Sequence, residues 1–427
     1  MNEYELIVIG GGPAGMAAAL EAQRQGITKI LILERAEFLG GILEQCIHTG
    51  FGLHYFKEEL TGPEYAARFA VQVEQSAKIE VKLDTMALDM QAGENAHTVF
   101  AVNKNEGLLQ LSARAVVLAM GCRERPRGAL NIAGTRPAGI MSAGAAQKYV
   151  NLDGYLPGRE VVVLGSGDIG LIMARRMTFE GANVKMVCEL MPYSSGLTRN
   201  IVQCLYDFDI PLKLSCTVIA VHGKERLEGV TIANVDENLR PIQGTEEYVP
   251  CDLLLLSVGL IPENELSRGA GVAMDAITSG AVVDQDRETC IPGVFACGNV
   301  LHVHDLVDYV TLEGQLAGAG AAQYLRGGRR PESAEYIMTR GGDGVRYIVP
   351  QKVNRRVTDP VKLYFRVDKV YKNAAVVLRA GDEILTQRKR PRLAPGEMED
   401  ITVTPEQLAA LPEGMELVIE VMEGDAA

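Results

Sequence analysis

The sequence predicts an α/β fold with two Rossmann-like dinucleotide-binding domains of the three-layer ββα type, followed by a small C-terminal β-sandwich. Two glycine-rich motifs of the form GxGxxG each stand between an apolar run and a predicted helix. After about residue 340, short runs alternate apolar and polar residues between Gly, Pro and Asp turns. We expect one nucleotide-binding domain at 1–125 and 259–328, a second at 126–258, a linker at 329–339 and a β-rich domain at 340–427.

The first motif lies near the N-terminus. An apolar run at residues 4–9 predicts a buried strand, the motif Gly10-x-Gly12-x-x-Gly15 follows at once, and residues 17–25 predict a helix. Gly10 permits the tight turn, Gly12 lets a pyrophosphate approach the backbone, and Gly15 lets the helix lie against the strand. The helix N-terminus offers N–H groups and the positive end of its dipole to phosphates. The next predicted strand ends on Glu34, whose carboxylate can accept a hydrogen bond from a ribose hydroxyl.

The same arrangement recurs in the middle of the chain. A predicted strand at 160–164 precedes Gly165-Ser166-Gly167-Asp168-Ile169-Gly170, a helix is expected at 171–180, and the strand at 183–188 ends on Glu189. In both halves the acid follows the first glycine of the motif by 24 positions. Two motifs with matching spacing indicate two dinucleotide sites more specifically than either motif alone.

Composition excludes several classes of function. The 427 residues exceed what one hydrophobic core usually holds, and the net charge of −13 argues against nucleic acid or an anionic membrane as the main partner. The N-terminus carries Asn2, Glu3 and Glu5 where a signal peptide would be basic, and no apolar run reaches the length of a membrane helix. We therefore expect a cytoplasmic protein without an integral membrane segment. The eight cysteines form no CxxC pair, so we expect no metal or iron–sulfur site within the chain.

The rest of the chain supplies further elements. Thr61-Gly62-Pro63-Glu64 predicts a helix start with a good N-cap. The carboxylates Asp305, Asp308 and Glu313 are interpreted as charges that favour the N-terminus of the last helix. The expected elements are a helix at 61–76, strands at 79–83, 98–102, 115–118, 252–258 (ending at Gly259) and 289–299, and a long alanine-rich helix at 309–325.

In the C-terminal region, one basic segment is ambiguous. The run Arg388-Lys389-Arg390-Pro391-Arg392 is interpreted as a solvated loop, with a docking patch as the alternative. The strands expected there lie at 361–367, 376–378, 399–404 and 416–421.

Four features within residues 3–328 carry a resemblance: the two GxGxxG loops, Ala119-Met120-Gly121 and the segment 293–299. In these features the chain resembles the flavoproteins with two dinucleotide-binding domains, the superfamily of thioredoxin and disulfide reductases. The resemblance implies FAD at the first motif and NAD(P)H at the second, with hydride exchanged between nicotinamide and flavin. The FAD-binding residues that it implies are Gly10, Gly12, Pro13, Ala14, Gly15, Glu34, Arg35, Gly40, Gly41, Gly121, Gly298 and Asn299. Those implied for NAD are Gly165, Gly167, Asp168, Ile169, Gly170, Glu189 and Gly259.

The chain departs from this superfamily at several points. Asn299 stands where the superfamily usually has Asp, Leu43 and His48 stand where one branch has its redox cysteines, and the usual C-terminal dimerisation domain is missing. We therefore expect no disulfide reductase. Arg125-Pro126 and residues 136–147 resemble the larger flavoprotein subunits of hydrogen cyanide synthase, opine oxidase and dye-linked proline dehydrogenase. They also resemble the flavoprotein that accompanies anaerobic glycerol-3-phosphate dehydrogenase. This resemblance implies two partners, a small iron–sulfur electron carrier and a sister flavoprotein dehydrogenase subunit.

The predicted function is an FAD-dependent NAD(P)H oxidoreductase that serves as the electron-transferring subunit of a multi-flavin dehydrogenase. Glu189 favours NAD(H), because its carboxylate would repel the extra phosphate of NADP; the alternative is a vestigial second site. Cys46, with His48 nearby, suggests a self-contained NADH oxidase or peroxidase. The alternative is that Cys46 is only a small buried residue in a glycine-rich loop. His302, like His304, is expected either near the polar edge of the flavin, where it could hydrogen-bond the flavin or donate a proton in catalysis, or in an ordinary core or helix-capping role. A module that only holds FAD for assembly or redox sensing is a further alternative.

Overall fold

The computed structural model describes residues 2–327 and 335–423. Contacts divide the described chain into two compact units. The first contains the residues up to Cys122 together with those from Pro262 onward, and the second is Arg123–Ile261. The expected linker at 329–339 lies largely outside the described residues, and its last part, from Tyr336, is strand.

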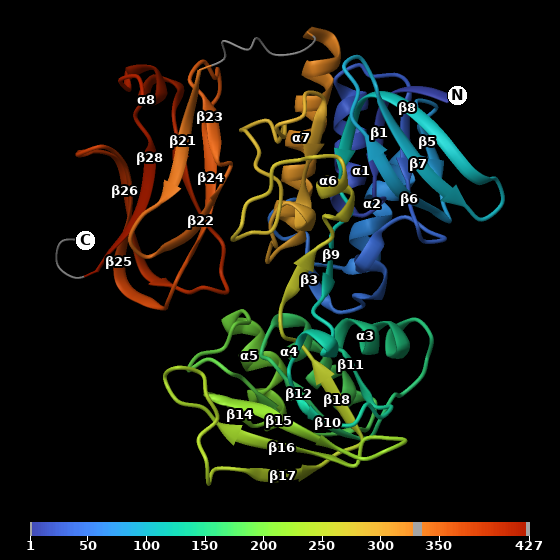
Figure 1. The fold of residues 1–427 in the computed structure, drawn as a ribbon, viewed down its shortest axis with the longest axis vertical. Helices are drawn as coiled ribbons and strands as arrows, with labels where there is room; N and C mark the ends of the chain where they lie inside the picture. The colour runs from blue at the N-terminus through green and yellow to red at the C-terminus, as the bar shows by residue number, and fades with distance from the viewer. Residues whose placement is uncertain (1, 328–334, 424–427) are drawn as a thin grey trace. The chain divides into compact units, whose positions relative to one another are not determined.

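The first unit is built on a mixed seven-stranded sheet (Figure 1). Its order is β5-β2-β1-β8-β7-β6, with β20 paired to β8. β1, β2, β5 and β20 run parallel to one another and to the end of β8, whereas β6 and β7 join the start of β8 as an antiparallel meander. The strands are β1 (Asn2–Ile9), β2 (Ile30–Leu33), β5 (Ile79–Lys82), β6 (Thr85–Gln91), β7 (His97–Asn103), β8 (Gly107–Leu118) and β20 (Val294–Ala296).

Alternation along β1 explains the layers of this unit. Leu6 and Val8 belong to a core shared with helices α1 and α2 and with α7, while Ile7 and Ile9 belong to a second core shared with the meander. The helices are α1 (Pro13–Arg24), α2 (Gly62–Glu74), α6 (Glu265–Gly269) and α7 (Val307–Gly327), and the short elements are η1 (Gly41–Gln45), β3 (Thr49–Phe51), β4 (Leu60–Thr61) and η4 (Gly298–Val300). α2 begins with the expected cap, because the Thr61 and Glu64 side chains form a capping box.

Helix α7 lies directly against α1, the helix of the first glycine motif (Figure 1). The close approach depends on two glycines: an added Cβ would lie 2.3 Å from the Ala14 carbonyl oxygen at Gly314 and 2.2 Å from that of Ala18 at Gly318. The fold thus brings the C-terminal end of this nucleotide-binding domain onto the helix that starts at the glycine motif.

We expect Gly314→Ala to lower the free energy of unfolding by about 1–3 kcal/mol, because the added methyl group would force α7 away from α1. Gly327→Ala on the same helix is the matched control, since a Cβ there would meet no described atom within 4 Å. Urea denaturation of both variants measures the difference. Equal midpoints for the two variants would show that the contact between the helices tolerates a methyl group.

The second unit, Arg123–Ile261, has three layers. A parallel sheet of order β11-β18-β12-β13-β14 lies between helices and a four-stranded sheet of order β10-β15-β16-β17. Val161 and Val163 face the helices, while Val162 and Leu164 face the second sheet. Its strands are β10 (Ala133–Gly134), β11 (Ile140–Ser142), β12 (Glu160–Leu164), β13 (Asn183–Cys188), β14 (Leu212–Lys213), β15 (Cys216–His222), β16 (Gly229–Asn234), β17 (Glu247–Pro250) and β18 (Leu253–Leu256). Its helices are η2 (Arg127–Ala129), α3 (Ala143–Asn151), α4 (Asp168–Phe179), α5 (Thr198–Cys204) and η3 (Tyr206–Phe208); β9 (Cys122–Glu124) and β19 (Leu260–Pro262) lie where the chain passes between the units.

The C-terminal part of the first unit is the expected β-sandwich. Two sheets, of order β23-β21-β28-β25-β26 and β22-β24-β27, enclose one apolar core. All pairs are antiparallel except β21 with β28. The elements are β21 (Tyr336–Gly341), β22 (Val345–Val349), β23 (Lys352–Asn354), β24 (Val361–Val367), β25 (Tyr371–Ala380), β26 (Glu383–Leu393), β27 (Glu399–Val403), α8 (Pro405–Ala410) and β28 (Leu417–Glu423).

One prediction for this region is wrong. The basic run Arg388–Arg392 is not a loop but part of β26, an edge strand that pairs with β25 through 374–376. An edge strand accepts this composition because one of its sides faces solvent, where charges and Pro391 are tolerated.

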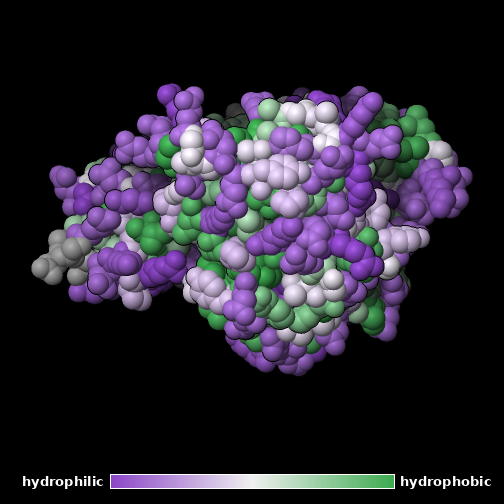
Figure 2. Space-filling view, turned by 90° about the horizontal axis from the view of Figure 1, so that it is seen from below, coloured by the Kyte–Doolittle hydropathy of each residue, from purple (hydrophilic) through white to green (hydrophobic). Residues whose placement is uncertain are grey.

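No helix among the described residues is long and apolar enough to cross a membrane. On the face drawn in Figure 2, hydrophilic and hydrophobic residues are interspersed.

Candidate functional site

The first glycine motif has the geometry that a dinucleotide requires. Gly10 has a φ of +111°, and a Cβ on Gly15 would lie 1.8 Å from the Gly10 carbonyl oxygen, so neither position accepts a side chain. Gly12 is the N-cap of α1 and has no side chain to accept from the first N–H groups of the helix. An added Cβ on Gly12 would meet no described atom within 4 Å. The N-terminus of α1 therefore offers its N–H groups to a ligand phosphate over an open approach.

Glu34, at the end of β2, is held beside this motif. Its carboxylate accepts hydrogen bonds from the N–H groups of Gly11 at 2.7 Å and Ala36 at 2.8 Å, and the residue is 7% exposed. These two bonds fix the carboxylate at the strand end, where a ribose hydroxyl can donate to it. Arg35 is exposed and pairs with Glu263 at 2.8 Å.

Two further glycine segments adjoin the motif. The N–H of Gly40 donates to the Gly11 carbonyl at 2.9 Å, and a Cβ on Gly41 would lie 3.2 Å from the Gly12 Cα. Gly298 packs against Ala14, because a Cβ added to Gly298 would lie 2.8 Å from the Ala14 Cβ. Bare backbone from three segments thus surrounds one helix N-terminus, which fits the pyrophosphate of FAD. When bound, FAD would supply the hydride and electron chemistry of the protein.

Asn299, expected to contact FAD, is half-buried and fixed by its own loop. Its Oδ1 accepts the N–H of His304 at 3.0 Å, and its Nδ2 lies 3.6 Å from the sulfur of Cys122, the residue after Gly121. The structure therefore brings the 121–122 turn and the segment 293–299 together. The individual FAD contacts of Asn299, Gly121 and the other residues named above stay predictions.

Cys46 and His48 are held by separate neighbours. The Cys46 thiol donates to the Ile42 carbonyl at 3.3 Å, and its carbonyl accepts the N–H of Gly62 at 2.8 Å. The His48 ring lies 5.0 Å from the ring of Phe51. Cys46 is half-buried. Its role in turnover stays a prediction.

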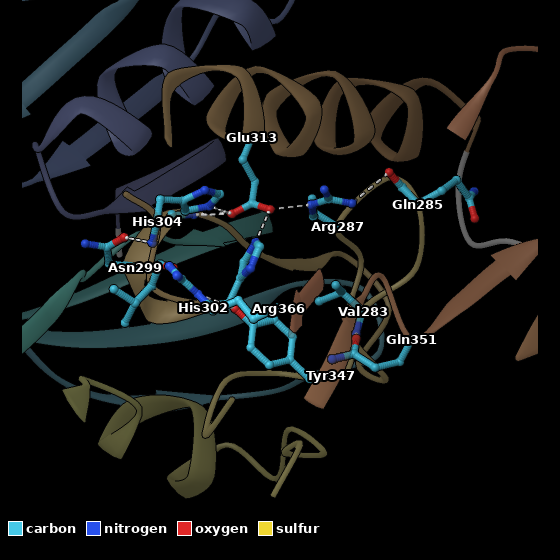
Figure 3. A network of polar contacts seen from close by, with 12 residues as sticks. Val283, Gln285, Arg287, Asn299, His302, His304, Glu313, Tyr347, Gln351 and Arg366 are labelled. Carbon is cyan, nitrogen blue, oxygen red and sulfur yellow. Dashed lines mark hydrogen bonds and ion pairs between the residues drawn. The ribbon is translucent and has the colours of Figure 1, made fainter. Parts of the chain in front are cut away.

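The main polar feature that the sequence did not predict is a buried group around Glu313, which we call the Glu313 cluster (Figure 3). The Glu313 carboxylate accepts from Arg287 Nε at 2.9 Å, His302 Nε2 at 3.0 Å, His304 Nε2 at 2.9 Å and the Gly298 N–H at 2.8 Å. Arg287, His302 and Glu313 are each 1% exposed. The interpretation of Glu313 as a charge at the N-terminus of a helix is therefore wrong, because its charge is paired inside the unit.

Burial and charge set the protonation of the Glu313 cluster. Burial would raise the pKa of Glu313, but the neighbouring imidazoles and the Arg287 guanidinium hold that pKa well below its ordinary value. Burial lowers the pKa of His302 to about 4, from an ordinary 6.5. An unfolded chain therefore takes up this proton before the folded one, so His302 reduces stability as the pH falls from about 6.5 to about 4.

The two imidazoles and the carboxylate offer ligand atoms within 4.8 Å of one another, which is compact enough for a metal ion. Arg287 argues against a metal, because its fixed positive charge lies 2.9 Å from the same carboxylate in a buried environment. The Nδ1 atoms of His302 and His304 have no partner among the described residues, whereas each Nε2 hydrogen-bonds to Glu313. We interpret the cluster as a hydrogen-bonded ion pair.

Asp308 lies in the first turn of α7, as the sequence predicts, and its side chain also binds a loop far away in the sequence. Its carboxylate is 1% exposed and accepts the N–H groups of Gly52 at 3.2 Å, His54 at 3.1 Å and Tyr55 at 2.7 Å. These bonds fix the 52–55 loop to the start of α7. The sequence signal for both carboxylates was their placement on a helix that is otherwise rich in small and apolar residues.

The second glycine motif repeats this geometry in the other unit. Gly165 has a φ of +94°, Gly167 caps α4, and a Cβ on Gly170 would lie 2.6 Å from Ser257 Cβ. Glu189 accepts the N–H groups of Ser166 and Met191, each at 2.9 Å, and also the Ser166 hydroxyl. Glu189 is 6% exposed. Glu189 therefore occupies the position in this unit that Glu34 has in the other.

The loop after Glu189 lies against the second motif. The Ser195 N–H donates to Ser166 Oγ at 3.0 Å, and the Leu197 N–H donates to the Asp168 carboxylate at 2.9 Å. Asp168 also accepts from Asn200 at 2.6 Å. The loop is therefore tied to the N-terminal end of α4. An added Cβ on Gly259 would meet no described atom within 4 Å, so the backbone there is open, and its contact with NAD stays a prediction, as does that of Ile169.

Comparison with curated proteins finds components of multisubunit enzymes. An opine oxidase subunit of Agrobacterium tumefaciens (strain Ach5) is 26% identical over 371 residues, which are 81% of this chain and 70% of that protein. The HcnB subunit of hydrogen cyanide synthase from Pseudomonas protegens is 25% identical over 283 residues, 62% of this chain. The match spans only 58% of HcnB.

Among solved structures, the thioredoxin reductase of T. acidophilum superposes with a TM-score of 0.63 at 22% identity over 76% of this chain and 99% of that one. The L-proline dehydrogenase of P. horikoshii gives 0.53 at 21% identity over 77% and 57%. Both likenesses concern the fold. The model of the pyridine nucleotide-disulphide oxidoreductase family matches residues 4–334. The expectation of FAD and a pyridine nucleotide as cofactors is thus confirmed, and the chain belongs to the pyridine nucleotide-disulphide oxidoreductase family as an FAD-dependent NAD(P)H oxidoreductase.

Proposed function

We propose that this chain exchanges a hydride between NAD(H), bound at the Gly165–Gly170 motif, and FAD, bound at the Gly10–Gly15 motif. The nucleotides supply the reacting atoms, and the protein supplies alignment and electrostatics. In this reaction no side chain needs to act as an acid or a base for the hydride step itself.

The observation that carries this proposal is the common construction of the two motifs. In each unit a carboxylate at a strand end, Glu34 or Glu189, accepts the N–H of the residue after the first glycine and the N–H two residues beyond itself. The intact geometry of the second motif argues against a vestigial site. Because the Glu189 carboxylate is negative and fixed where a ribose would bind, it favours NAD(H) over NADP(H).

The test is anaerobic rapid mixing of the FAD-loaded protein with NADH or with NADPH, followed through the visible absorbance of oxidised flavin. We expect fast loss of this absorbance with NADH and slow loss with NADPH. If neither nucleotide reduces the flavin, hydride entry through this chain is wrong, and a module that holds FAD for a partner becomes the better explanation.

We further propose that the electrons pass between this chain and a partner subunit. The opine oxidase relative and HcnB are both named as subunits, which supports a partner subunit for this chain. The partners that we propose are a sister flavoprotein dehydrogenase and a small iron–sulfur electron carrier. Rapid turnover of the chain alone with NADH and peroxide, lost in Cys46→Ala, would instead support a self-contained peroxidase.

A further inference from the structure

The C-terminal sandwich contacts the loop between the segment 293–299 and helix α7. Asp305 in this loop pairs with Arg366 of β24, and its other carboxylate oxygen accepts the Met398 N–H at 2.5 Å. Asp305 and Arg366 side chains are each 12% exposed. The interpretation of Asp305 as a charge that serves the helix is therefore wrong, because both of its oxygens are used by the sandwich.

Arg366 makes more contacts than this ion pair. Its Nη2 also donates to the Val303 carbonyl at 3.0 Å, its Nη1 to the Pro395 carbonyl at 3.1 Å and its Nε to the Tyr347 hydroxyl at 3.2 Å. All three guanidinium nitrogens are thus engaged, two with the sandwich and one with the loop. A planar guanidinium with every nitrogen bonded holds its partners in one geometry.

The position of these contacts along the loop is what links them to the flavin site. Arg366 holds Val303 and Asp305, the two neighbours of His304. His304 in turn donates its N–H to Asn299 and bonds Glu313 through its ring, and Glu313 accepts the Gly298 N–H. A shift of Arg366 would therefore reach Asn299 through the 303–305 loop, and Gly298 through that loop and Glu313.

The sandwich is fixed to the rest of the unit at other places too. Gln351 exchanges two hydrogen bonds with the backbone of Val283, at 3.0 and 3.2 Å (Figure 3). The ring of Tyr364 lies 6.0 Å from the Arg287 guanidinium and 6.1 Å from the His302 ring. The sandwich is thus held in place without Arg366, so removing Arg366 perturbs the loop rather than releasing the whole domain.

We propose that Arg366 is a positioning residue of the FAD site, through which the C-terminal sandwich sets the orientation of Asn299 and so the affinity and potential of the flavin. This inference rests on the assignment of FAD to the first glycine motif. It gives the sandwich, which the family match to residues 4–334 does not cover, a direct part in cofactor binding.

The test compares Arg366→Met, Arg366→Lys and Asp305→Asn with the parent protein. The full chain is stripped of FAD and titrated with it to obtain Kd, and the flavin midpoint potential is measured by dye equilibration. We expect Arg366→Met to weaken FAD binding by about 5- to 50-fold and to shift the potential. Arg366→Lys should recover only part of the affinity, because an ammonium can reach Asp305 but cannot also bond Val303, Pro395 and Tyr347.

The matched control is Arg355→Met. Arg355 is 15% exposed, pairs with Glu335 at 3.4 Å and donates to the Pro412 carbonyl at 3.0 Å, so its contacts stay within the sandwich. Its loss should cost stability but leave the FAD Kd within two-fold and the potential unchanged. The inference is overturned if Arg366→Met keeps the Kd and the potential of the parent protein. It is also overturned if Arg355→Met loses as much FAD affinity as Arg366→Met. If Arg366→Met does not fold, the Asp305→Asn result decides in the same way. A parent protein that binds no FAD would overturn the FAD assignment itself, and this inference with it.

Discussion

Replacing Glu313 by glutamine is expected to lower the free energy of unfolding by about 3–5 kcal/mol, the cost of leaving a buried charge without its partner. Glu313 accepts four hydrogen bonds inside the first unit, and a glutamine would turn an NH₂ group toward those donors. The Arg287 guanidinium, 1% exposed, would remain charged and lose its carboxylate. Urea denaturation and thermal unfolding of the FAD-loaded protein measure the effect.

A double-mutant cycle separates the charge effect from the loss of packing. Arg287→Met combined with Glu313→Gln removes both charges, so we expect the double variant to be more stable than Glu313→Gln alone by more than about 1 kcal/mol. Glu416→Gln is the control, because its pair with Arg340 at 3.2 Å is about half exposed and should contribute about 0–1 kcal/mol. A Glu313→Gln variant within about 1 kcal/mol of the parent would contradict the ion-pair interpretation.

The second large effect is expected at Glu189. In Glu189→Ala, the ratio of kcat/KM for flavin reduction by NADPH over that by NADH should rise about 100-fold, or about 2.7 kcal/mol of transition-state free energy. The reason is the loss of a fixed carboxylate that favours a ribose hydroxyl and repels a 2′-phosphate. Anaerobic stopped-flow reduction with each nucleotide gives the two values of kcat/KM.

Two further variants serve as controls for this result. Glu189→Gln removes the charge at nearly constant size, which matters because Ser166 and Met191 donate to the carboxylate. Glu247→Ala removes an exposed carboxylate from the same unit, where it pairs with Lys213 at 2.6 Å, and should leave the ratio unchanged. An unchanged ratio in folded, FAD-loaded Glu189 variants would show that Glu189 does not select the nucleotide.

The elements best predicted from the sequence are those decided over short distances. Each glycine motif lies between a strand and a helix, and its turn needs particular residues at fixed spacing, as the φ of +111° at Gly10 shows. Alternation of apolar residues likewise predicts the sandwich, because each of its sheets has one face on a shared core. The basic composition at 388–392 wrongly predicts a loop. An edge strand tolerates polar residues at nearly every position, so its sequence can look like that of a loop.

Residue spacing and composition alone predict the two nucleotide motifs, their acids Glu34 and Glu189 and the change in residue pattern near residue 340. The partners of Glu313, Asp308 and Asp305 become apparent only in the folded chain. Glu313 meets Arg287 across 26 residues, Asp308 meets Gly52 across 256 and Asp305 meets Arg366 across 61. A carboxylate on a helix, or just before one, has the same local pattern whether it faces solvent or a buried donor. Its partner is chosen by the packing of segments far apart in the chain.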